Sequence, residues 1–540
     1  MSQTLRIVLA QSDFPVGDIQ KNTEKHIHLA RIAHEELKAD VIVFPELSLT
    51  GYPPEDLLYR KDFLAETARA LDTCRRSIHD IFCIIGHPQI TPKGLYNSCS
   101  IFLNGETLGY YAKQRLPNEG VFDEHRYFIP GKEPCIVPMK GIPVGIVICE
   151  DLWHPGPAIQ AAEHGAKLLL SPNASPFEIN KHERRQKVLS ARARTTALPI
   201  LYTNLVGGQD EFVYDGGSLA IDGSGKVCHC AGFFKESLTA VDLTFSKDGT
   251  TMSHGTFEVP SQPERIHSAL VMGTRDYVHR NNLTGALVGV SGGIDSALTL
   301  AVAVDALGKD NVTAVIMPSR YTSELSMEEA VAVSKNLGVR YDIISVEPLF
   351  ESTLQTLEPH LRNSAPEIVA QNIQARCRAI VLMALSNQSG KIVLTTGNRS
   401  EMAVGYTTLY GDMAGGFAVL KDIPKTLVYQ LGRHRNGISS VIPERTLTRA
   451  PTAELSPGQK DSDSLPAYDI LDPILERYLN HEESADQIIA SGYSPETVQR
   501  VISLIHQSEY KRRQAPPGVR INHRAFGRDR RYPLTSGWKK

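Results

Sequence analysis

Three residues in the first half of the chain bring together the groups that amide cleavage needs. Cys149 ends the apolar run VGIVIC, so its thiol leaves a strand at a turn, where a nucleophile is accessible. Glu46 ends the run DVIVFPE, and Lys113 follows GYYA. A carboxylate can act as general base and an ammonium can stabilise a tetrahedral intermediate, so this set can hydrolyse an amide through a thioester without a histidine. The alternative for the cysteine alone is a small buried apolar side chain.

A second candidate site lies in the stretch LVGVSGGIDSALTL, which reads as an apolar strand, a Gly-Gly turn and the start of a helix. Such a turn presents backbone N–H groups and the positive end of a helix dipole to an anion. The Lys that nucleotide triphosphatases place after the second glycine is absent. Asp295 beside a phosphate requires a divalent cation between them, so Mg²⁺-pyrophosphate is the natural ligand. The alternative is a purely structural strand-to-helix turn.

The elements that must position these residues alternate in type along the first half of the chain. Strand-like runs such as LRIVLAQ and AKLLLSPNAS are separated by helical patterns such as residues 22–39. Asn-Gly at Asn104 and Asp-Gly at Asp215 and Asp222 predict hairpin turns. These patterns indicate a mixed α/β or α+β domain with much sheet.

The second half alternates strand and helix as βαβ units do, which predicts a parallel, doubly wound sheet. Polar and turn residues collect around 246–267, so we predict domains at 1–250 and 266–540 with a linker at 251–265. Residues 445–469 are rich in Pro and Asp, and we predict a mobile loop there. Closing that loop over a nucleotide would keep water from a reactive intermediate.

Length, charge and cysteine usage narrow the class of protein. A chain of 540 residues is too long for one hydrophobic core. The balance of 57 basic and 60 acidic residues gives no field that attracts nucleic acid or anionic membrane, so we expect neither as a partner. We identify no signal peptide and no apolar run of about 18 residues. The eight cysteines form neither a disulfide framework nor a paired metal motif, and we expect a cytoplasmic protein.

The Gly-Gly turn resembles the SGGxDS motif of the ATP pyrophosphatases, which cleave ATP between its α and β phosphates and adenylate a carbonyl oxygen. Four later stretches resemble the NAD synthetase branch of that class. They are NIQARCRAIVLMALSN, LTTGNRSEMAVGYTTLYGD, KDIPKTLVY and RAPTAELSPGQKDSDSLPAYD. Four matches in order are more specific than the turn alone, so a Rossmann-like ATP pyrophosphatase domain is expected.

This resemblance implies roles for residues of the second half. ATP as co-substrate would be contacted by Gly289, Val290, Ser291, Gly292, Gly293, Ile294, Asp295, Ser296, Thr396, Lys425 and Thr452. Deamido-NAD would be contacted by Asn372, Glu401 and Lys511, and Mg²⁺ would be held by Asp295 and Glu401. Each has a structural alternative, since Thr396 ends a strand, Lys425 could be a solvated charge, and Thr452 could stiffen its loop.

The first half resembles the nitrilase superfamily, whose fold is an α-β-β-α sandwich, over residues 5–230. The stretches FPELSLTGYPPEDLL and ICEDLW resemble sequences of its glutamine-hydrolysing branch. That branch implies that Ser175 and Lys181 bind the backbone groups of glutamine and that Glu124 orients Lys113; a solvated helix charge is the alternative for Lys181. Glu119 stands where the family commonly has Tyr in the glutamine pocket, so we predict a working glutaminase with altered affinity.

Together the two halves resemble the glutamine-dependent NAD synthetases from end to end. The expected activity is the ATP-dependent amidation of deamido-NAD through an adenylate, with ammonia from glutamine, giving AMP, pyrophosphate and glutamate. An enclosed ammonia passage and a homo-oligomer, a dimer or higher, are expected with it. The alternatives are a glutamine amidotransferase acting on another carbonyl and a nucleotide-binding regulator with an inactive glutaminase. A nitrilase alone would leave the second half unexplained.

Overall fold

The computed structural model describes residues 2–247, 249–361, 367–456 and 458–538. The chain divides into two compact units, Met1–Pro260 and Ser261–Lys540. Residues 253–261 contain no helix or strand, and helix α5 (Gln262–Arg280) begins directly after them because the Ser261 hydroxyl caps the N–H of Glu264.

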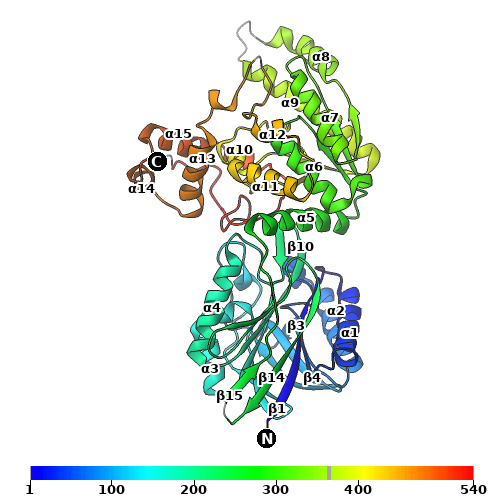
Figure 1. Ribbon diagram of the computed structural model, residues 1–540, viewed down its shortest axis with the longest axis vertical. Coiled ribbons are helices and arrows are strands. Elements are labelled where there is room, and N and C mark those ends of the chain that lie inside the picture. The colour runs from blue at the N-terminus through cyan, green and yellow to red at the C-terminus, as the bar shows by residue number, and fades with distance from the viewer. Residues whose placement is uncertain (1, 248, 362–366, 457, 539–540) are drawn as a thin grey trace. The chain divides into compact units, whose positions relative to one another are not determined.

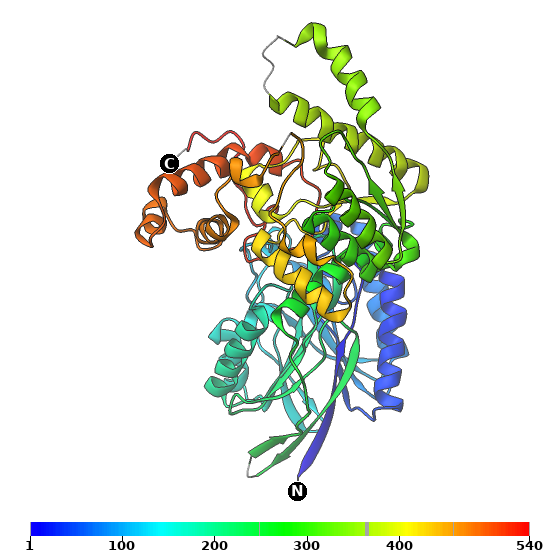
Figure 2. The same ribbon diagram turned by 45° about the horizontal axis from the view of Figure 1, so that its top comes forward.

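The first unit contains two stacked sheets covered by helices on both outer faces (Figure 1). One sheet has the order β15 (Gly249–Met252), β14 (Ser237–Ser246), β1 (Gln3–Gln11), β2 (Val41–Val43), β3 (Phe82–Thr91), β4 (Gly94–Leu103), β5 (Glu106–Ala112). The other has the order β13 (Val227–Cys230), β12 (Leu219–Ile221), β9 (Ile200–Asn204), β8 (Leu168–Asn173), β7 (Ile142–Ile146), β6 (Cys135–Met139). Helices α1 (Ile19–Glu35) and α2 (Lys61–Ser77) flank one side, and α3 (Pro155–Glu163) and α4 (Lys181–Thr196) flank the other, in both views (Figure 2).

Alternation along β1 shows how the sequence builds this sandwich. Ile7 packs in the layer between the sheets with residues such as Leu168 of the second sheet. Its neighbour Val8 packs on the outer face with Ile19 of α1 and Phe63 of α2. Since side chains along a strand point alternately to opposite faces, the apolar residues of this one strand supply both layers. The predicted α-β-β-α sandwich is confirmed.

Two of the three predicted hairpin turns are present. Asn104 joins the antiparallel strands β4 and β5, and Asp222 joins β12 and β13. The prediction at Asp215 is wrong. Strand β11 (Phe212–Asp215) pairs instead with β10 (Val206–Gln209) in a small separate sheet, and Asp215 takes a buried arginine as its partner.

The second unit is built on a parallel sheet with the strand order β18 (Arg340–Ile343), β17 (Val312–Ile316), β16 (Ala286–Gly289), β19 (Ile392–Thr395), β20 (Phe417–Ala418). The chain leaves β16 toward β17 and later returns to its other side at β19. That reversal of strand order opens a crevice at the carboxyl ends of β16 and β19, where such sheets bind ligands. The expected Rossmann-like fold is confirmed.

Helices surround this sheet, and a further group of helices lies at one side of the unit. Around the sheet lie α6 (Ile294–Leu307), α7 (Glu324–Asn336), α8 (Glu347–Leu357), α9 (Glu367–Ser389), α10 (Arg399–Val404), α11 (Lys425–Ile438) and α12 (Glu444–Thr448). A further group gathers at one side of this unit in both views: α13 (Tyr468–Leu475), α14 (Ala485–Ala490), α15 (Pro495–Gln507) and α16 (Glu509–Arg512) (Figures 1 and 2). Its core joins Ile474 and Ile502 to Met402 and Val404 of α10.

Helix α9 is, within the described part of the chain, the one helix that is long and apolar enough to cross a membrane by length and composition. Core helices of globular proteins share this length and composition. In the fold, Ile373 and Cys377 of α9 pack in a cluster with Val315 of β17 and Phe350 of α8.

Candidate functional site

Lys113 lies at the centre of a buried charge network in the first unit. Its Nζ donates to Glu46 Oε1 at 2.6 Å and to Glu124 Oε1 at 2.7 Å, and the side chain is 1% exposed. Glu46 follows β2, Lys113 follows β5, and Cys149 begins a short 3₁₀ turn, Cys149–Leu152, after β7. Strand ends from both sheets therefore supply the three residues that the sequence singled out.

Neutral donors complete the network around the two carboxylates. Asn97 Nδ2 donates to Glu46 Oε1 at 2.8 Å and to Glu124 Oε2 at 3.3 Å. The Tyr52 hydroxyl donates to Glu124 at 2.8 Å, and the Ala174 N–H donates to the second oxygen of Glu46 at 3.2 Å. Each carboxylate is thus held in one orientation, as a general base must be.

The pKa directions at this site follow from burial and from its charges. Burial lowers the pKa of Lys113, but Glu124 and Glu46 outweigh burial and raise that pKa well above its ordinary value. Burial, and then Glu46, raise the pKa of the Cys149 thiol well above its ordinary value, while Lys113 opposes them. Burial raises the pKa of Glu124 to about 7. The resting site therefore holds a neutral thiol beside a permanent cation, and the thiol needs a base before it can attack.

The expected glutamine-binding residues lie in different surroundings. Ser175 is buried, and its Oγ accepts from Arg185 Nε at 3.2 Å. Lys181, at the first turn of α4, places its Nζ 4.7 Å from the centre of the Trp153 ring. Glu119 is exposed on the loop after Lys113, where its carbonyl accepts from the Phe122 N–H.

Arg185 is a residue of this site that the sequence did not single out. It lies inside the first unit with an exposed fraction of 0%, pairs with Asp215 at 2.8 Å, and donates to the carbonyls of Ser175 and Pro176. It therefore fixes the loop that carries Ser175. The sequence of α4 is rich in charged residues, as is typical of a surface helix, so it gives no indication that Arg185 is buried.

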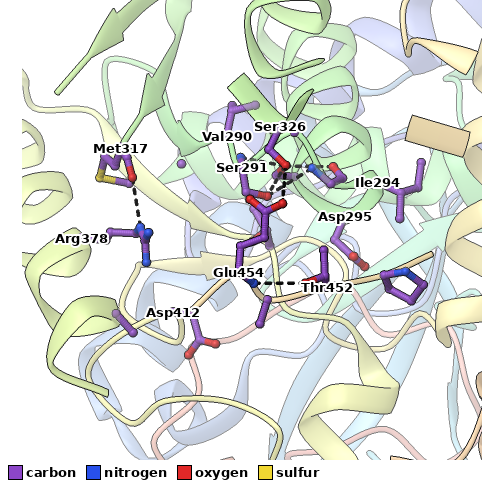
Figure 3. A pocket seen from close by; sticks show the side chains of 18 of the residues that line it. Val290, Ser291, Ile294, Asp295, Met317, Ser326, Arg378, Asp412, Thr452 and Glu454 are labelled. Atoms are coloured by element: carbon purple, nitrogen blue, oxygen red, sulfur yellow. Dashed lines mark hydrogen bonds between the residues drawn. The ribbon is translucent and has the colours of Figure 1, made fainter. Parts of the chain in front are cut away.

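The second unit holds a cavity of about 290 Å³ at the crevice between β16 and β19. Most of the residues expected at the nucleotide lie along its walls: Gly289, Val290, Ser291, Gly292, Gly293, Ile294, Asp295, Ser296, Thr396, Glu401, Lys425 and Thr452. Figure 3 shows Ser291 and Asp295 at this cavity, with Arg378 and Met317 at another part of its wall.

The Gly-Gly turn is built for close backbone approach. Gly292 has φ +83°, and a Cβ at this residue would stand 2.3 Å from the carbonyl oxygen of Ser326. Only glycine fits there. The hydroxyls of Ser291 and Ser296 lie 3.2 Å apart within the turn, and helix α6 begins at Ile294. The turn therefore offers hydroxyls and the N-terminal N–H groups of α6 to an anion.

Two carboxylates at this cavity converge on one cation. Lys425 Nζ contacts Asp295 Oδ2 and lies 3.5 Å from Glu401 Oε1. Burial lowers the pKa of Lys425, but Asp295 and Glu401 outweigh burial and raise it well above its ordinary value. Burial also raises the pKa of Glu401 to about 8. The oxygens of both carboxylates therefore already point toward a shared positive charge.

The same carboxylates suit the expected Mg²⁺. Within the described ranges, no group of three or more His, Cys, Asp or Glu side chains is arranged as a metal site. Mg²⁺ is commonly bound by only one or two carboxylates together with substrate phosphates, so Asp295 and Glu401 beside the phosphate turn fit it. Asn398 orients both, since its side-chain amide donates to Asp295 at 2.9 Å and its backbone N–H donates to Glu401 Oε2 at 3.4 Å. The Asn-x-x-Glu spacing of this capping box was readable in the sequence.

The polar segment after α12 lies along the cavity, as Figure 3 shows for Thr452 and Glu454. Glu454 accepts from the hydroxyls of Ser323 and Ser326 at 2.8 and 2.9 Å and from Arg449 at 2.6 Å. It thereby attaches this segment to the N-terminus of α7. Hydrogen bonding outweighs burial and lowers the pKa of Glu454.

Asn372 and Lys511 meet at the loop that follows α10. Asn372 Oδ1 accepts from Thr408 Oγ1 at 2.9 Å, and Lys511 Nζ donates to the carbonyls of Gly405 and Thr407, each at 2.8 Å. Asp412 of the same loop lines the cavity, and burial raises its pKa to about 6. Both expected residues therefore hold the loop beside the cavity, and the sequence had assigned no role to Asp412.

Comparison with known proteins identifies relatives of both units. The carbon-nitrogen hydrolase family model matches residues 5–250, and the NAD synthase family model matches residues 266–515. The glutamine-dependent NAD(+) synthetase of Xanthomonas campestris pv. campestris is 46% identical, over 99% of this chain and 98% of that protein. The one from Thermotoga maritima is 42% identical over 99% of each chain.

Solved structures agree with this relationship. The glutamine-dependent NAD+ synthetase from Acinetobacter baumannii, determined in complex with adenosine diphosphate, superposes with a TM-score of 0.80 at 42% identity over 99% of each chain. A glutamine-dependent NAD(+) synthetase from Cytophaga hutchinsonii, 22% identical over 99% of this chain and 98% of that one, shares the fold with a TM-score of 0.82.

Proposed function

Because this chain belongs to the family of glutamine-dependent NAD(+) synthetases, we propose that each of its two sites performs one half-reaction with the residues described above. The enzyme is a ligase that makes NAD with glutamine as amide donor and ATP as co-substrate. The buried Lys113, shared between Glu46 and Glu124 beside the Cys149 thiol, is the observation that carries the assignment of the glutaminase half.

In the glutaminase half-reaction, Cys149 attacks the side-chain carbonyl carbon of glutamine while Glu46 takes the thiol proton. Lys113 stabilises the oxyanion of the tetrahedral intermediate. Glu46 then returns the proton to the nitrogen, the C–N bond breaks, and ammonia leaves a thioester behind. Water activated by Glu46 hydrolyses this thioester to glutamate and frees the thiol. The raised pKa of Cys149 is the reason that a base is required at each addition.

In the synthetase half-reaction, the carboxylate of deamido-NAD attacks the α phosphorus of ATP, and pyrophosphate leaves. The turn from Ser291 to Ser296 and Lys425 stabilise the departing charge. Asp295 and Glu401 would hold Mg²⁺, which when bound neutralises phosphate charge. Ammonia then attacks the activated carbonyl carbon, and AMP leaves to give NAD. Until ammonia attacks, the segment around Thr452 excludes water from the adenylate.

Replacing Cys149 by Ala tests the division of labour. Glutamine-driven NAD synthesis is expected to be lost, while synthesis driven by an ammonium salt continues at the wild-type rate. Retention of glutamine-driven synthesis would contradict the assignment of the nucleophile, and loss of both activities would contradict the independence of the synthetase site.

Ammonia must reach the adenylate without being protonated or lost, so we propose an enclosed passage and a homo-oligomeric enzyme. The ratio of glutamine consumed to NAD made tests the passage, since a ratio well above one indicates leakage. Sedimentation of the full chain tests the oligomer. We also propose a cytoplasmic location, in agreement with eight cysteines that are all unpaired.

A further inference from the structure

We propose that Asp151 is a positioning residue for glutamine hydrolysis, and that its carboxylate holds Cys149 and Lys113 at a fixed separation. The inference rests on the proposed roles of Cys149 and Lys113. Asp151 touches no reacting atom in that mechanism, so its effect has to pass through the two segments that it joins.

The contacts of Asp151 connect the segment around Lys113 with the segment around Cys149. Oδ1 accepts from the N–H groups of Gln114 and Arg115, at 3.1 and 2.8 Å. Oδ2 accepts from the Ile148 N–H at 3.0 Å and from the Tyr111 hydroxyl at 2.9 Å. The side chain is fully buried, so no water competes for these positions.

The donors stand directly beside the catalytic groups. Gln114 and Arg115 follow Lys113 at the end of β5, and Tyr111 lies on β5 itself. Ile148 precedes Cys149 at the end of β7. Strands β5 and β7 belong to different sheets, so one carboxylate spans the two sheets at the point where the nucleophile and the ammonium emerge.

The Cys149 backbone needs such a restraint. Its φ is +44°, in the left-handed region that residues with a Cβ rarely adopt. Strained backbone of this kind persists only where its surroundings over-determine it. The Ile148 N–H bond to the Asp151 side chain and the Asp151 N–H bond to the Ile148 carbonyl, 3.0 Å each, close the turn around Cys149.

Conversion of Asp151 to Asn is the sharpest test because it keeps the side-chain shape. An amide has one acceptor oxygen, so its NH₂ group must face either the N–H groups of Gln114 and Arg115 or the Ile148 N–H, since the Tyr111 hydroxyl can turn to accept but a backbone N–H cannot. The segments would separate. Since misplacing a catalytic group by about 1 Å costs about 100-fold in rate, we expect kcat for glutamine-driven synthesis to fall by about that factor.

A positioning role predicts that kcat with glutamine falls while glutamine KM and ammonium-driven synthesis change little. A general loss of structure would change all of these quantities. Glutamine KM is expected to change less than about threefold, because Ser175 and Lys181 remain in place. Ammonium-driven synthesis by the same sample is expected to match the wild type. The rate at which iodoacetamide alkylates Cys149 is expected to fall in parallel with kcat.

Two further variants calibrate the effect. Tyr111→Phe removes one of the four donors, so a smaller fall in kcat of about three- to tenfold is expected. Asp242→Asn is the matched control, since Asp242 accepts from Arg6 at 2.7 and 2.8 Å and is 38% exposed. No change in glutamine-driven kcat is expected for it.

The results for these variants distinguish a failure of the role proposed for Asp151 from a failure of the proposed function. If Asp151→Asn keeps wild-type kcat with glutamine, or if KM rises while kcat is unchanged, the positioning role is wrong. If Asp151→Asn does not fold, Tyr111→Phe decides, and an unchanged kcat there overturns the proposal. If Cys149→Ala still uses glutamine, the proposed function itself fails, whatever Asp151→Asn shows.

Discussion

Replacing Glu454 by Ala is expected to make the synthetase waste ATP. Glu454 fastens the segment that follows α12 to the N-terminus of α7, where it accepts from Ser323, Ser326 and Arg449. Alanine removes every one of these bonds. The segment would then open more often over the nucleotide cavity, and water would reach the adenylate.

The contacts set the size of the effect. A hydrogen bond to a charged group contributes about 1.5–3 kcal/mol, and the bonds that meet on one carboxylate are not additive. The Glu454 side chain is 17% exposed, and the freed serines can turn to water, so we take about 2 kcal/mol for the set. That free energy corresponds to about a 30-fold change in the ratio of closed to open segment.

The assay measures AMP and NAD in the same reaction. Ammonium replaces glutamine as nitrogen source, so that the first unit does not contribute, and it is kept limiting so that the adenylate must wait. Wild type is expected to form AMP and NAD in nearly equal amounts. For Glu454→Ala the AMP formed without NAD is expected to rise by up to about 30-fold, with a higher KM for ATP.

A neighbouring variant provides the control. Glu328 pairs with Arg445 at 3.1 Å, and both side chains are more than half exposed, at 55% and 61%. Exposed pairs of this kind contribute little, so Glu328→Ala is expected to keep the wild-type ratio of AMP to NAD. An unchanged ratio in Glu454→Ala would refute the reasoning, because the segment would then close without this contact.

Two buried histidines, Asn398 and Glu119 each predict a measurable effect. Burial lowers the pKa of His26 to about 3 and that of His87 to about 4, so the unfolded chain binds protons more readily below the ordinary histidine pKa. Lowering the pH from 7 to 5 should therefore reduce the free energy of unfolding by about 2 kcal/mol for each histidine. Unfolding midpoints in urea that stay constant over this pH range would contradict the prediction. Asn398→Ala frees Asp295 from its amide donor and should raise the Mg²⁺ concentration for half-maximal ammonium-driven synthesis by about tenfold; an unchanged Mg²⁺ titration would show that the contact is dispensable. Glu119→Tyr should shift the glutamine KM while ammonium-driven kinetics stay constant, and an identical KM would show that the position does not face the substrate.

Strand ends were the most predictable feature of both sites. The sequence places Glu46, Lys113 and Cys149 at the ends of apolar runs, and it places the turn around Asp295 between a strand and a helix. The structure has each of them there. Periodicity and turn residues are local properties of the chain, so a reader of the sequence can locate them without knowing the fold.

Positions that depend on distant partners were harder to predict. The residues adjacent to Asp215 in sequence are typical of a hairpin turn. Asp215 instead pairs with Arg185, which is 30 residues away along the chain. Arg185 itself sits among charged neighbours in a helix that reads as solvated. Neither burial nor partner is encoded in the nearest residues, because each arises when separate segments pack against one another.

The sequence by itself determined the chemistry of this enzyme: which groups are present, which of them end strands, and which family they resemble. Tertiary structure alone decided which groups share a proton or a charge. Lys113 meets Glu46 across 67 residues, and Lys425 meets Asp295 across 130. Their raised pKa values depend on those encounters together with burial. The physical reason is that desolvation and Coulomb interaction depend on distance in space, which only the packed sheets and helices establish.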